Sequence, residues 1–321
     1  MLLSIIIPVY NVEPYIRECF NSIIKQNFSS DVEIVVIDDG STDNSGIICD
    51  EYAKKYKNII VIHQENQGLS VVRNIGLSIA KGIYIAWIDP DDYIDENWYK
   101  VILSSLDDNN DIILFDYMTD NNGVLKKYKY KDKSQNIGRE QVLYDLSCDQ
   151  KLKSYLWQKV IKRELYENIN FSREIKCMED YAELHKIILK AENIYYISEY
   201  LYFYRVRENS LVNLVDFEKS YKCFLIAKDR YNYLNHLNIR HSPIAIFIHA
   251  LGVYDVYQKI KDIDISNQYQ SKFNECKDII KKNIIYIIFS KDCDLILKIK
   301  FLLCYFNLFS VARKIYRWIL K

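Results

Sequence analysis

The sequence predicts an α/β fold built on a doubly wound, mostly parallel sheet, and two observations support that prediction. Apolar runs alternate with segments of helical periodicity over residues 3–88. Parallel strands are buried on both faces, so they read as continuous apolar runs separated by helical crossovers. Two of these runs also end abruptly in aspartates, as expected where the carboxyl ends of strands form a ligand-binding edge.

The elements follow in order from the residue pattern. The expected strands are the apolar runs at residues 3–9, 32–37, 59–63, 84–88, 112–117 and 194–204, the last of which reads as one or two strands. The expected helices between the early strands lie at about 14–27, 44–55 and 69–80. We expect a polar hairpin or loop at 123–133, a mixed and mostly helical stretch at 139–188, and helices throughout 216–321.

The run at residues 84–88 is followed by three aspartates within four residues, Asp89, Asp91 and Asp92. Pro90 cannot continue a strand ladder, so the strand must stop there and present these carboxylates at its end. Such crowding is unfavourable unless a cation neutralises it, and hard oxygen ligands suit Mg²⁺ or Mn²⁺. An acidic turn that caps the next helix explains the same residues and stays open as an alternative.

A second acidic pair, Asp38 and Asp39, follows the strand at 32–37. In a parallel sheet both acidic groups would lie on one edge. The glycine-rich G-x-G-x-x-G fingerprint of dinucleotide binding does not occur, and glycines are few. A phosphate-bearing ligand would therefore have to be held through a metal.

Composition narrows the class of protein. Half of the 321 residues are apolar and the formal net charge is zero, which argues against a general nucleic-acid binder. Eight scattered cysteines without a C-x-x-C pair indicate free thiols in a reducing cytosol. The start, MLLSIIIPVYNVEPY, has no basic segment before its apolar run and is interpreted as a strand rather than a signal peptide.

Four segments, taken together and in this order, resemble the signatures of family 2 glycosyltransferases. They are Pro8-Val9-Tyr10-Asn11, Asp38-Asp39-Gly40-Ser41-Thr42-Asp43, Asn66-Gln67-Gly68 with Arg73-Asn74-Ile75-Gly76, and Asp89-Pro90-Asp91-Asp92. The resemblance covers roughly residues 3–210. It implies a GT-A, nucleotide-sugar-binding catalytic domain at 1–215, with a nucleotide-binding half at 1–118 and an acceptor-binding half at 119–215, followed by a helical region at 216–321.

The resemblance also implies a donor site. Pro8, Tyr10 and Asn11 would line the base and ribose, and Asp38 or Asp39 would accept the uracil imide N–H. The resemblance further implies that Arg73 lies near the nucleotide and Asp89 near the ribose. Asp91 and Asp89 would ligate the metal, and Asp92 would lie beside them in the donor site. For Asn66, Arg73 and Asn74, loop and helix-cap chemistry is the alternative.

On the acceptor side, Glu179-Asp180 resembles the Glu-Asp pair of the same family, in which the aspartate is the catalytic base. An inverting transfer needs a carboxylate that takes the acceptor hydroxyl proton. Asp180 is the expected base, and Glu179 is its neighbour or a structural cap. An exposed acidic helix start is the alternative.

Three further residues have two interpretations each. Trp157 could stack on the apolar face of a sugar, or pack in the core. Arg205 or Arg207 could meet the diphosphate, or form a solvated turn.

The Q-x-x-R-W signature of processive members is absent, which favours transfer of a single sugar.

The segment 281–321 is both apolar and basic, with nine Lys or Arg against two Asp. Its longest uncharged stretch, residues 301–312, is shorter than the ~20 residues that a spanning helix needs. Arg313, Arg317 and Lys321 recur at helical spacing beside Trp318. The pattern predicts a helix lying in an anionic membrane surface, and packing on the catalytic domain or a partner is the alternative.

The resulting hypothesis is a metal-dependent inverting glycosyltransferase, using Mn²⁺ or Mg²⁺, that moves one sugar from a UDP-sugar to a saccharide acceptor. The acceptor is expected to be lipid-linked and to serve a capsule or exopolysaccharide, with the enzyme peripheral on the cytoplasmic face of the cell membrane and without a nucleic-acid partner. A nucleotidyltransferase, and a non-catalytic nucleotide-sugar-binding assembly subunit, are the rival functions.

Overall fold

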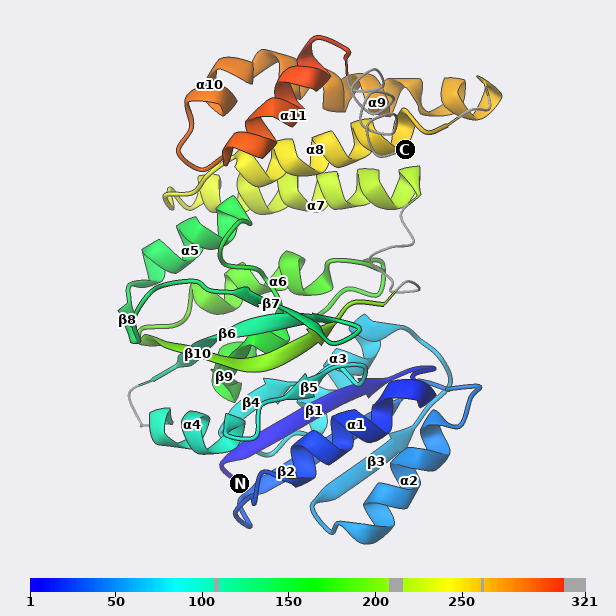
Figure 1. Ribbon diagram of the computed structural model, residues 1–321, viewed down its shortest axis with the longest axis vertical. Helices are drawn as coiled ribbons and strands as arrows, with labels where there is room; N and C mark the ends of the chain where they lie inside the picture. The colour runs from blue at the N-terminus through cyan, green and yellow to red at the C-terminus, as the bar shows by residue number, and fades with distance from the viewer. Residues whose placement is uncertain (107–109, 208–215, 261–262, 309–321) are drawn as a thin grey trace. The chain divides into compact units, whose positions relative to one another are not determined.

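The chain divides into two compact units. The computed structural model describes residues 1–106, 110–207, 216–260 and 263–308 (Figure 1). Unit 1 contains Met1–Val142 and Lys153–Glu208, and unit 2 contains Leu143–Leu152 and Asn209–Lys321. The predicted end of the catalytic domain, at residue 215, lies outside the described residues.

Unit 1 is organised around one mixed sheet. The strand order is β3-β2-β1-β4-β9-β6-β10-β5, with β7 paired to β6 and β8 paired to β10. The strands are β1 (Leu3–Val9), β2 (Val32–Asp38), β3 (Ile59–His63), β4 (Tyr84–Trp87), β5 (Tyr93–Ile94), β6 (Ile112–Asn121), β7 (Val124–Tyr128), β8 (Gln135–Ile137), β9 (Lys159–Lys162) and β10 (Ile194–Arg205).

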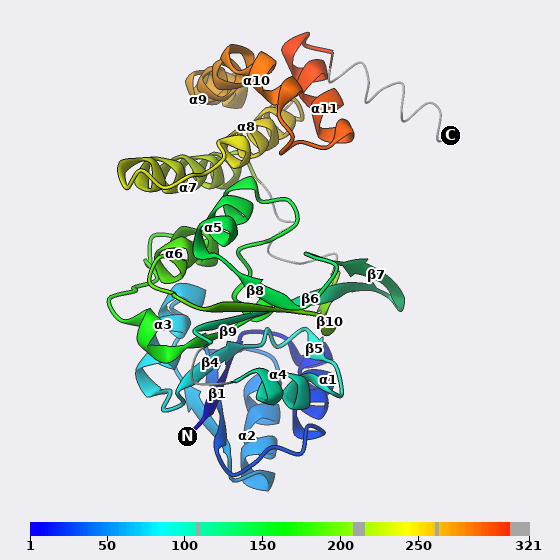
Figure 2. The ribbon, with the colours of Figure 1, turned by 90° about the vertical axis from the view of Figure 1, so that its left-hand side faces the viewer.

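The first half of this sheet is the predicted doubly wound core. β1 pairs in parallel with both β2 and β4, and β2 pairs in parallel with β3. Every residue of β1 and β2 is buried, as their continuous apolar runs require. The crossover helices are α1 (Glu13–Ile24), α2 (Ser45–Lys55) and α3 (Leu69–Ile79). Right-handed crossovers place α1 and α2 on one face and α3 on the other, which Figure 2 shows. The predicted α/β class is confirmed.

The second half of the sheet departs from a simple parallel order. β9 lies between β4 and β6 and is antiparallel to both. The residue pattern predicts a mostly helical stretch here, because a strand of four residues is too short to show a period. β10 is a single strand parallel to β6, with register shifts between Ile197 and Tyr202 that mark an irregularity.

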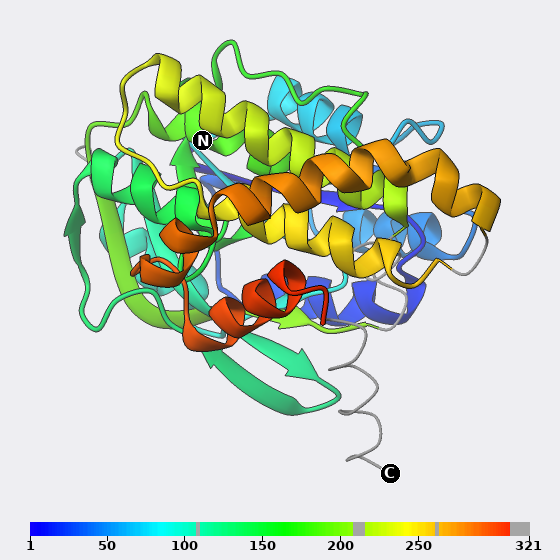
Figure 3. The ribbon, with the colours of Figure 1, turned by 90° about the horizontal axis from the view of Figure 1, so that it is seen from above.

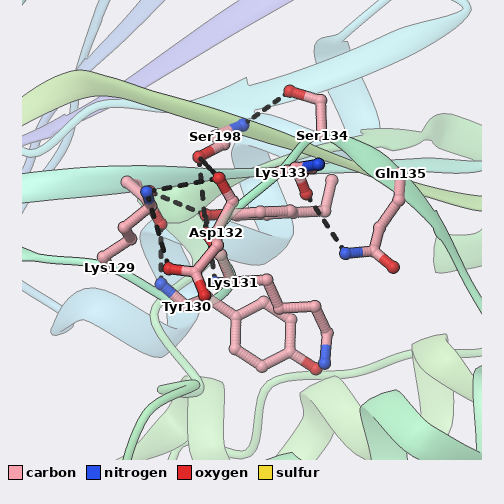
Figure 4. Close-up of polar contacts among 10 residues, drawn as sticks. Lys129, Tyr130, Lys131, Asp132, Lys133, Ser134, Gln135 and Ser198 are labelled. Atoms are coloured by element: carbon pink, nitrogen blue, oxygen red, sulfur yellow. Dashed lines mark hydrogen bonds and ion pairs between the residues drawn. The ribbon is translucent and has the colours of Figure 1, made fainter.

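Residues 123–133, predicted as a polar hairpin or loop, contain the second strand of a hairpin, β7, which pairs with β6, and the loop that follows it. Asn122 (φ 51°) and Gly123 (φ 86°) are the two residues between the paired Asn121 and Val124, the Asn-Gly arrangement that a two-residue hairpin turn favours. The loop that follows β7 is fastened to β10, as Figure 4 shows: Ser198 N donates to Ser134 Oγ at 2.9 Å.

The other helices of the chain are α4 (Trp98–Ser105), α5 (Arg139–Cys148), α6 (Glu179–Ile188), α7 (Phe217–His236), α8 (Ile244–Tyr257), α9 (Ile263–Lys282), α10 (Ile284–Phe289) and α11 (Leu295–Tyr305), with short 3₁₀ turns at Leu156–Gln158 and Arg163–Tyr166. In unit 2, α8 packs against both α7 and α9 (Figure 3). Residues 216–308 are helical as predicted, apart from short links and the undescribed 261–262, and the last part of the basic tail, 309–321, lies outside the described residues. Among the helices described, none has the length and apolar character needed to cross a bilayer.

Candidate active site

The carboxyl ends of β1, β2 and β4 meet at one edge of the sheet. β1 pairs with β2 through Val9 and Asp38 and with β4 through Ile6 and Trp87, so the residues after each strand emerge together. Pro8 is buried within β1, whereas Tyr10 is 47% exposed. Asn11 adopts a positive φ of 49°, and its Oδ1 accepts a hydrogen bond from Thr42 N at 2.7 Å.

Asp38 and Asp39 both hold their loops in place. Asp38 accepts from Ser41 N at 3.0 Å and pairs with His63 Nδ1 at 2.8 Å. The hydrogen bonds of the His63 ring to the carboxylates of Asp38 and Asp50 raise the pKa of His63. Asp39 accepts from Gln67 N at 2.9 Å and from Gly68 N at 2.8 Å, so it fixes the loop before α3. It also accepts from Gln64 Nε2 at 2.6 Å. A carboxylate has about four acceptor positions, so Asp39 keeps capacity for one further donor.

Glycine is required where that loop meets the end of β2. Gly40 has a φ of 71°, and a Cβ there would lie 2.8 Å from Asn66 N. The bare backbone allows the loop to approach Asp39 closely.

Asp92 ties the acidic turn to β10. Its side chain is 1% exposed and accepts hydrogen bonds from Arg205 N at 2.7 Å and from the Tyr202 hydroxyl at 2.9 Å. The same hydroxyl accepts from Asp89 N at 3.0 Å. These contacts make Asp92 a residue that positions Asp89 and Asp91. Tyr202 was not singled out from the sequence, since its strand reads as uniformly aromatic.

The two arginines after β10 have different partners. Arg205 Nε donates to the Asp91 carbonyl at 2.9 Å, and its Nη2 lies 2.7 Å from Glu18, so Arg205 clamps the turn. Arg207 Nη2 lies 2.5 Å from Asp91 Oδ2. Of the two arginines that the sequence left open, Arg207 is therefore the one that contacts the carboxylate expected to bind a metal.

The electrostatics of the turn suit a divalent cation. Burial raises the pKa of Asp89 to about 7, opposed by Arg73 and reinforced by the charge of Asp91. In the described part of the chain, no three His, Cys, Asp or Glu residues are arranged to hold a metal ion by themselves. Mg²⁺ is usually held by one or two carboxylates together with substrate phosphates and waters, rather than by a cage of protein ligands. Asp89 and Asp91 fit that donor set.

A buried ion pair joins α3 to the start of α6. Arg73 is 3% exposed, and its Nε and Nη2 each lie 3.0 Å from Glu179 Oε1. The guanidinium also lies over the ring of Trp87, 4.9 Å from its centroid. Arg73 Nη1 is buried and has no hydrogen-bond partner among the described residues.

Asp180 lies beside this ion pair. Its Oδ1 accepts from Tyr181 N at 2.6 Å, within the first turn of α6. Burial raises the pKa of Asp180 to about 7, the charge of Glu179 adds to that rise, and Arg73 opposes it. Arg73 interacts electrostatically with both Asp89 and Asp180. The acidic turn and the predicted base therefore belong to one network of charges around a single guanidinium.

Trp157 and Lys159 are both buried. Trp157 is 4% exposed and its ring stacks on Tyr155 at 4.7 Å and on Tyr202 at 4.4 Å. This geometry favours the core alternative over stacking on a sugar. Lys159 is fully buried, donates to the carbonyls of Lys153 and Tyr155, and lowers the pKa of Asp180 against the effect of burial. The sequence offered no signal for this placement.

We expect Arg73→Met to destabilise unit 1 strongly, because it would leave the Glu179 carboxylate buried without its partner. Removing one member of a buried pair costs about 3–5 kcal/mol in the free energy of unfolding. Urea unfolding of the full chain measures the difference.

The matched control is Arg17→Met, which breaks the exposed Arg17–Glu51 ion pair of 2.8 Å and should leave the free energy of unfolding almost unchanged, because solvent screens the pair. A double variant, Arg73→Met with Glu179→Leu, should recover much of the loss. Equal unfolding free energies for Arg73→Met and Arg17→Met would contradict the assignment of a buried pair.

Comparison with known proteins identifies the family. The family model described as glycosyl transferase family 2 matches residues 4–172. The chain is 31% identical over 307 residues to glycosyltransferase GlyA of Streptococcus pneumoniae, covering 88% of this chain and 43% of GlyA. It is 27% identical over 311 residues to the minor teichoic acid biosynthesis protein GgaB of Bacillus subtilis, covering 92% of this chain and 33% of GgaB. The chain thus spans less than half the length of these two relatives.

A solved structure shares the fold. S. aureus TarS 1-349, in complex with UDP-GlcNAc, superimposes with a TM-score of 0.69 at 22% identity, covering 98% of this chain and 92% of that one. The likeness confirms the predicted GT-A architecture. Because the family model matches more than half of the sequence, this chain belongs to glycosyl transferase family 2.

Proposed function

We propose that this chain transfers one sugar from a UDP-sugar to a saccharide acceptor, with inversion at the anomeric carbon. The observation that carries the proposal is the charge network around Arg73, which links the acidic turn at Asp89 to Asp180. An inverting transfer needs an activated leaving group and a base on the opposite side of the reacting carbon, and this network supplies a candidate for each. Family membership supports the reaction class, and the uridine donor held by TarS supports the choice of nucleotide.

At the donor end, Asp91 and Asp89 would hold Mn²⁺ or Mg²⁺, a cation that neutralises charge developing on the leaving diphosphate. Tyr10, Asn11 and Pro8 would border the base and ribose, because they end the strand next to Asp38 and Asp39. Arg207, already beside Asp91, would meet the diphosphate. Arg205 and Asp92 would act through the backbone of the turn, which their hydrogen bonds hold in place.

At the acceptor end, Asp180 would accept the proton of the attacking hydroxyl. Glu179 would position it, because the ion pair with Arg73 fixes the first turn of α6. Trp157 would act by packing against Tyr202, whose hydroxyl holds the acidic turn, and not by direct contact with the sugar.

The acceptor in this proposal is a lipid-linked saccharide of a bacterial surface glycan. The name of GgaB places that relative in teichoic acid synthesis, and the apolar and basic segment 281–321 suits a peripheral position on the cytoplasmic face of the cell membrane. The family match disfavours a nucleotidyltransferase, whereas the non-catalytic binder shares the same fold.

The proposal is tested by nucleotide release. Purified protein with Mn²⁺ or Mg²⁺ is given a panel of UDP- and GDP-sugars with saccharide acceptors, and free nucleoside diphosphate is measured. We expect release from a UDP-sugar that stops when the cation is chelated. Tight UDP binding without release from any donor and acceptor pair would support the non-catalytic binder, and no nucleotide binding at all would exclude both functions.

The rate should also depend on pH near neutrality. A general base works only when deprotonated, and burial raises the pKa of Asp180 to about 7. We expect kcat/KM to fall roughly tenfold for each pH unit below that value, whereas an ordinary aspartate would lose activity only near its unperturbed pKa of ~4. UDP binding measured over the same pH range separates this effect from loss of the donor. A flat rate between pH 5 and pH 8 (roughly the span over which such a base titrates) would contradict the role of Asp180.

A further inference from the structure

The exposed side of α11 is apolar along its whole length. The helix buries Phe301 and Cys304 completely within unit 2. On the other side, Leu295 is 73% and Ile299 49% exposed, and Phe306, the residue at the C-cap, is 61% exposed. At about 100° per residue these positions lie within one narrow stripe, and including Ile296 widens it to roughly 100° of arc. A surface helix normally packs such a stripe against the protein core. In α11 the apolar stripe faces solvent instead.

The preceding helix, α10, also has large apolar side chains exposed to solvent. Ile285 and Phe289, one helical turn apart on α10, are 74% and 82% exposed. Figure 3 shows α10 leading into α11 within unit 2. Single exposed apolar side chains are normal on a protein surface, but a contiguous group marks an interaction site. We call the group made by Ile285, Phe289, Leu295, Ile296, Ile299 and Phe306 the α10–α11 face.

Two lysines flank this face. By helical position, Lys298 and Lys300 fall on opposite edges of the α11 stripe. The two nearby acids are engaged within unit 2: Asp294 caps α11 through Leu297 N at 2.7 Å, and Asp292 accepts from the Tyr144 hydroxyl at 2.9 Å. An apolar stripe with lysines on both edges is the pattern of a helix that lies in a membrane interface, where lysine stems extend to the lipid headgroups.

A second copy of the chain fits this surface less well. If two such faces met across a two-fold axis, the lysines flanking each stripe would be brought toward one another, and like charges at an interface are unfavourable. At an anionic membrane surface the acyl chains match the apolar stripe and the headgroups match its basic edges.

We propose that the α10–α11 face lies on the anionic surface of a lipid bilayer. The inference rests on the peripheral membrane contact of the proposed function, and it assigns that contact to described residues. It does not depend on the transfer chemistry. Binding to the membrane then does not depend on the basic residues at 309–321 alone, because the α10–α11 face provides its apolar part.

Vesicle sedimentation of the full chain tests the assignment. The probes are vesicles of equimolar phosphatidylcholine and phosphatidylglycerol, and vesicles of phosphatidylcholine alone. We expect the wild type to sediment with the first and far less with the second. The double substitution Phe289→Ser and Ile296→Ser should lower partitioning by about tenfold or more, because two apolar side chains no longer enter the interface. Lys298→Glu with Lys300→Glu should weaken binding to the anionic vesicles by a similar factor.

The matched control is Val124→Ser in unit 1, where a valine that is 72% exposed should not affect partitioning. Unfolding midpoints equal to that of the wild type establish that the variants are folded. Unchanged partitioning of the Phe289 and Ile296 double variant would overturn the proposal. The proposal would also be overturned if the wild type did not sediment with anionic vesicles. The same holds if the wild type instead forms a dimer that this double substitution dissociates.

Nucleotide release distinguishes failure of the membrane proposal from failure of the transferase proposal. With a water-soluble acceptor, the Phe289 and Ile296 double variant should release UDP at the wild-type rate. Vesicle binding without nucleotide release in any variant would defeat the transferase proposal and leave the membrane face intact.

Discussion

Replacing Asp180 with asparagine is expected to lower the rate of sugar transfer by a factor of about 10²–10⁴, the usual contribution of a general base. Asparagine keeps the shape of the side chain, and its amide oxygen can still accept the hydrogen bond from Tyr181 N. It cannot take a proton from the acceptor hydroxyl. The effect should therefore fall on kcat, while UDP affinity, measured by calorimetry, stays within about threefold of the wild-type value.

Glu174→Gln is the matched control, because it removes an exposed carboxylate from the segment just before α6. It should leave the rate unchanged. If Asp180→Asn retained a wild-type rate with a donor and acceptor pair that the enzyme turns over, another group would have to accept the proton.

Replacing Asp91 with asparagine should remove the metal requirement together with most of the activity. The substitution removes the carboxylate that we propose as a metal ligand and leaves Arg207 without its charged partner. A divalent cation supplies several kcal/mol of stabilisation to the leaving diphosphate, so we expect a loss of about 10²–10³-fold in kcat/KM. Calorimetry should show that Mn²⁺ no longer strengthens UDP binding, a readout that does not depend on turnover.

Glu96→Gln, an exposed carboxylate shortly after the same turn, controls for the loss of one negative charge. Mn²⁺ should strengthen UDP binding to this variant as it does to the wild type. Equal enhancement in Asp91→Asn would remove Asp91 from the metal site and leave Asp89 to be tested in the same way.

Local patterns predicted the parts of the fold that local rules decide. The apolar runs of β1, β2 and β3 and the helices between them lie within a few residues of their expected positions. Both acidic groups occur at strand ends: Pro90, which cannot join a strand ladder, lies three residues beyond the end of β4, and Gly40 allows the sharp turn after β2. These outcomes depend on short stretches of chain, in which periodicity and turn chemistry are sufficient evidence.

Residues whose roles depend on distant partners could not be interpreted in the same way. Trp157 reads equally well as a sugar platform or a core residue, and the stacking on Tyr155 and Tyr202 favours the core. Asp92 was grouped with the donor-binding residues, yet its oxygens accept from groups on β10, over a hundred positions later in the chain. β9 was missed, because a four-residue strand gains its stability from the two strands it joins.

The sequence by itself determined the fold class, the family resemblance and the list of carboxylates that could carry the chemistry. Only the tertiary structure decided which of them act together. It joined Arg73 to Glu179, set Arg207 against Asp91, and left the apolar face of α11 toward solvent. The physical reason is that periodicity and turn propensity depend on near neighbours, whereas burial, ion pairing and the orientation of a helix face depend on segments that only the folded chain brings together.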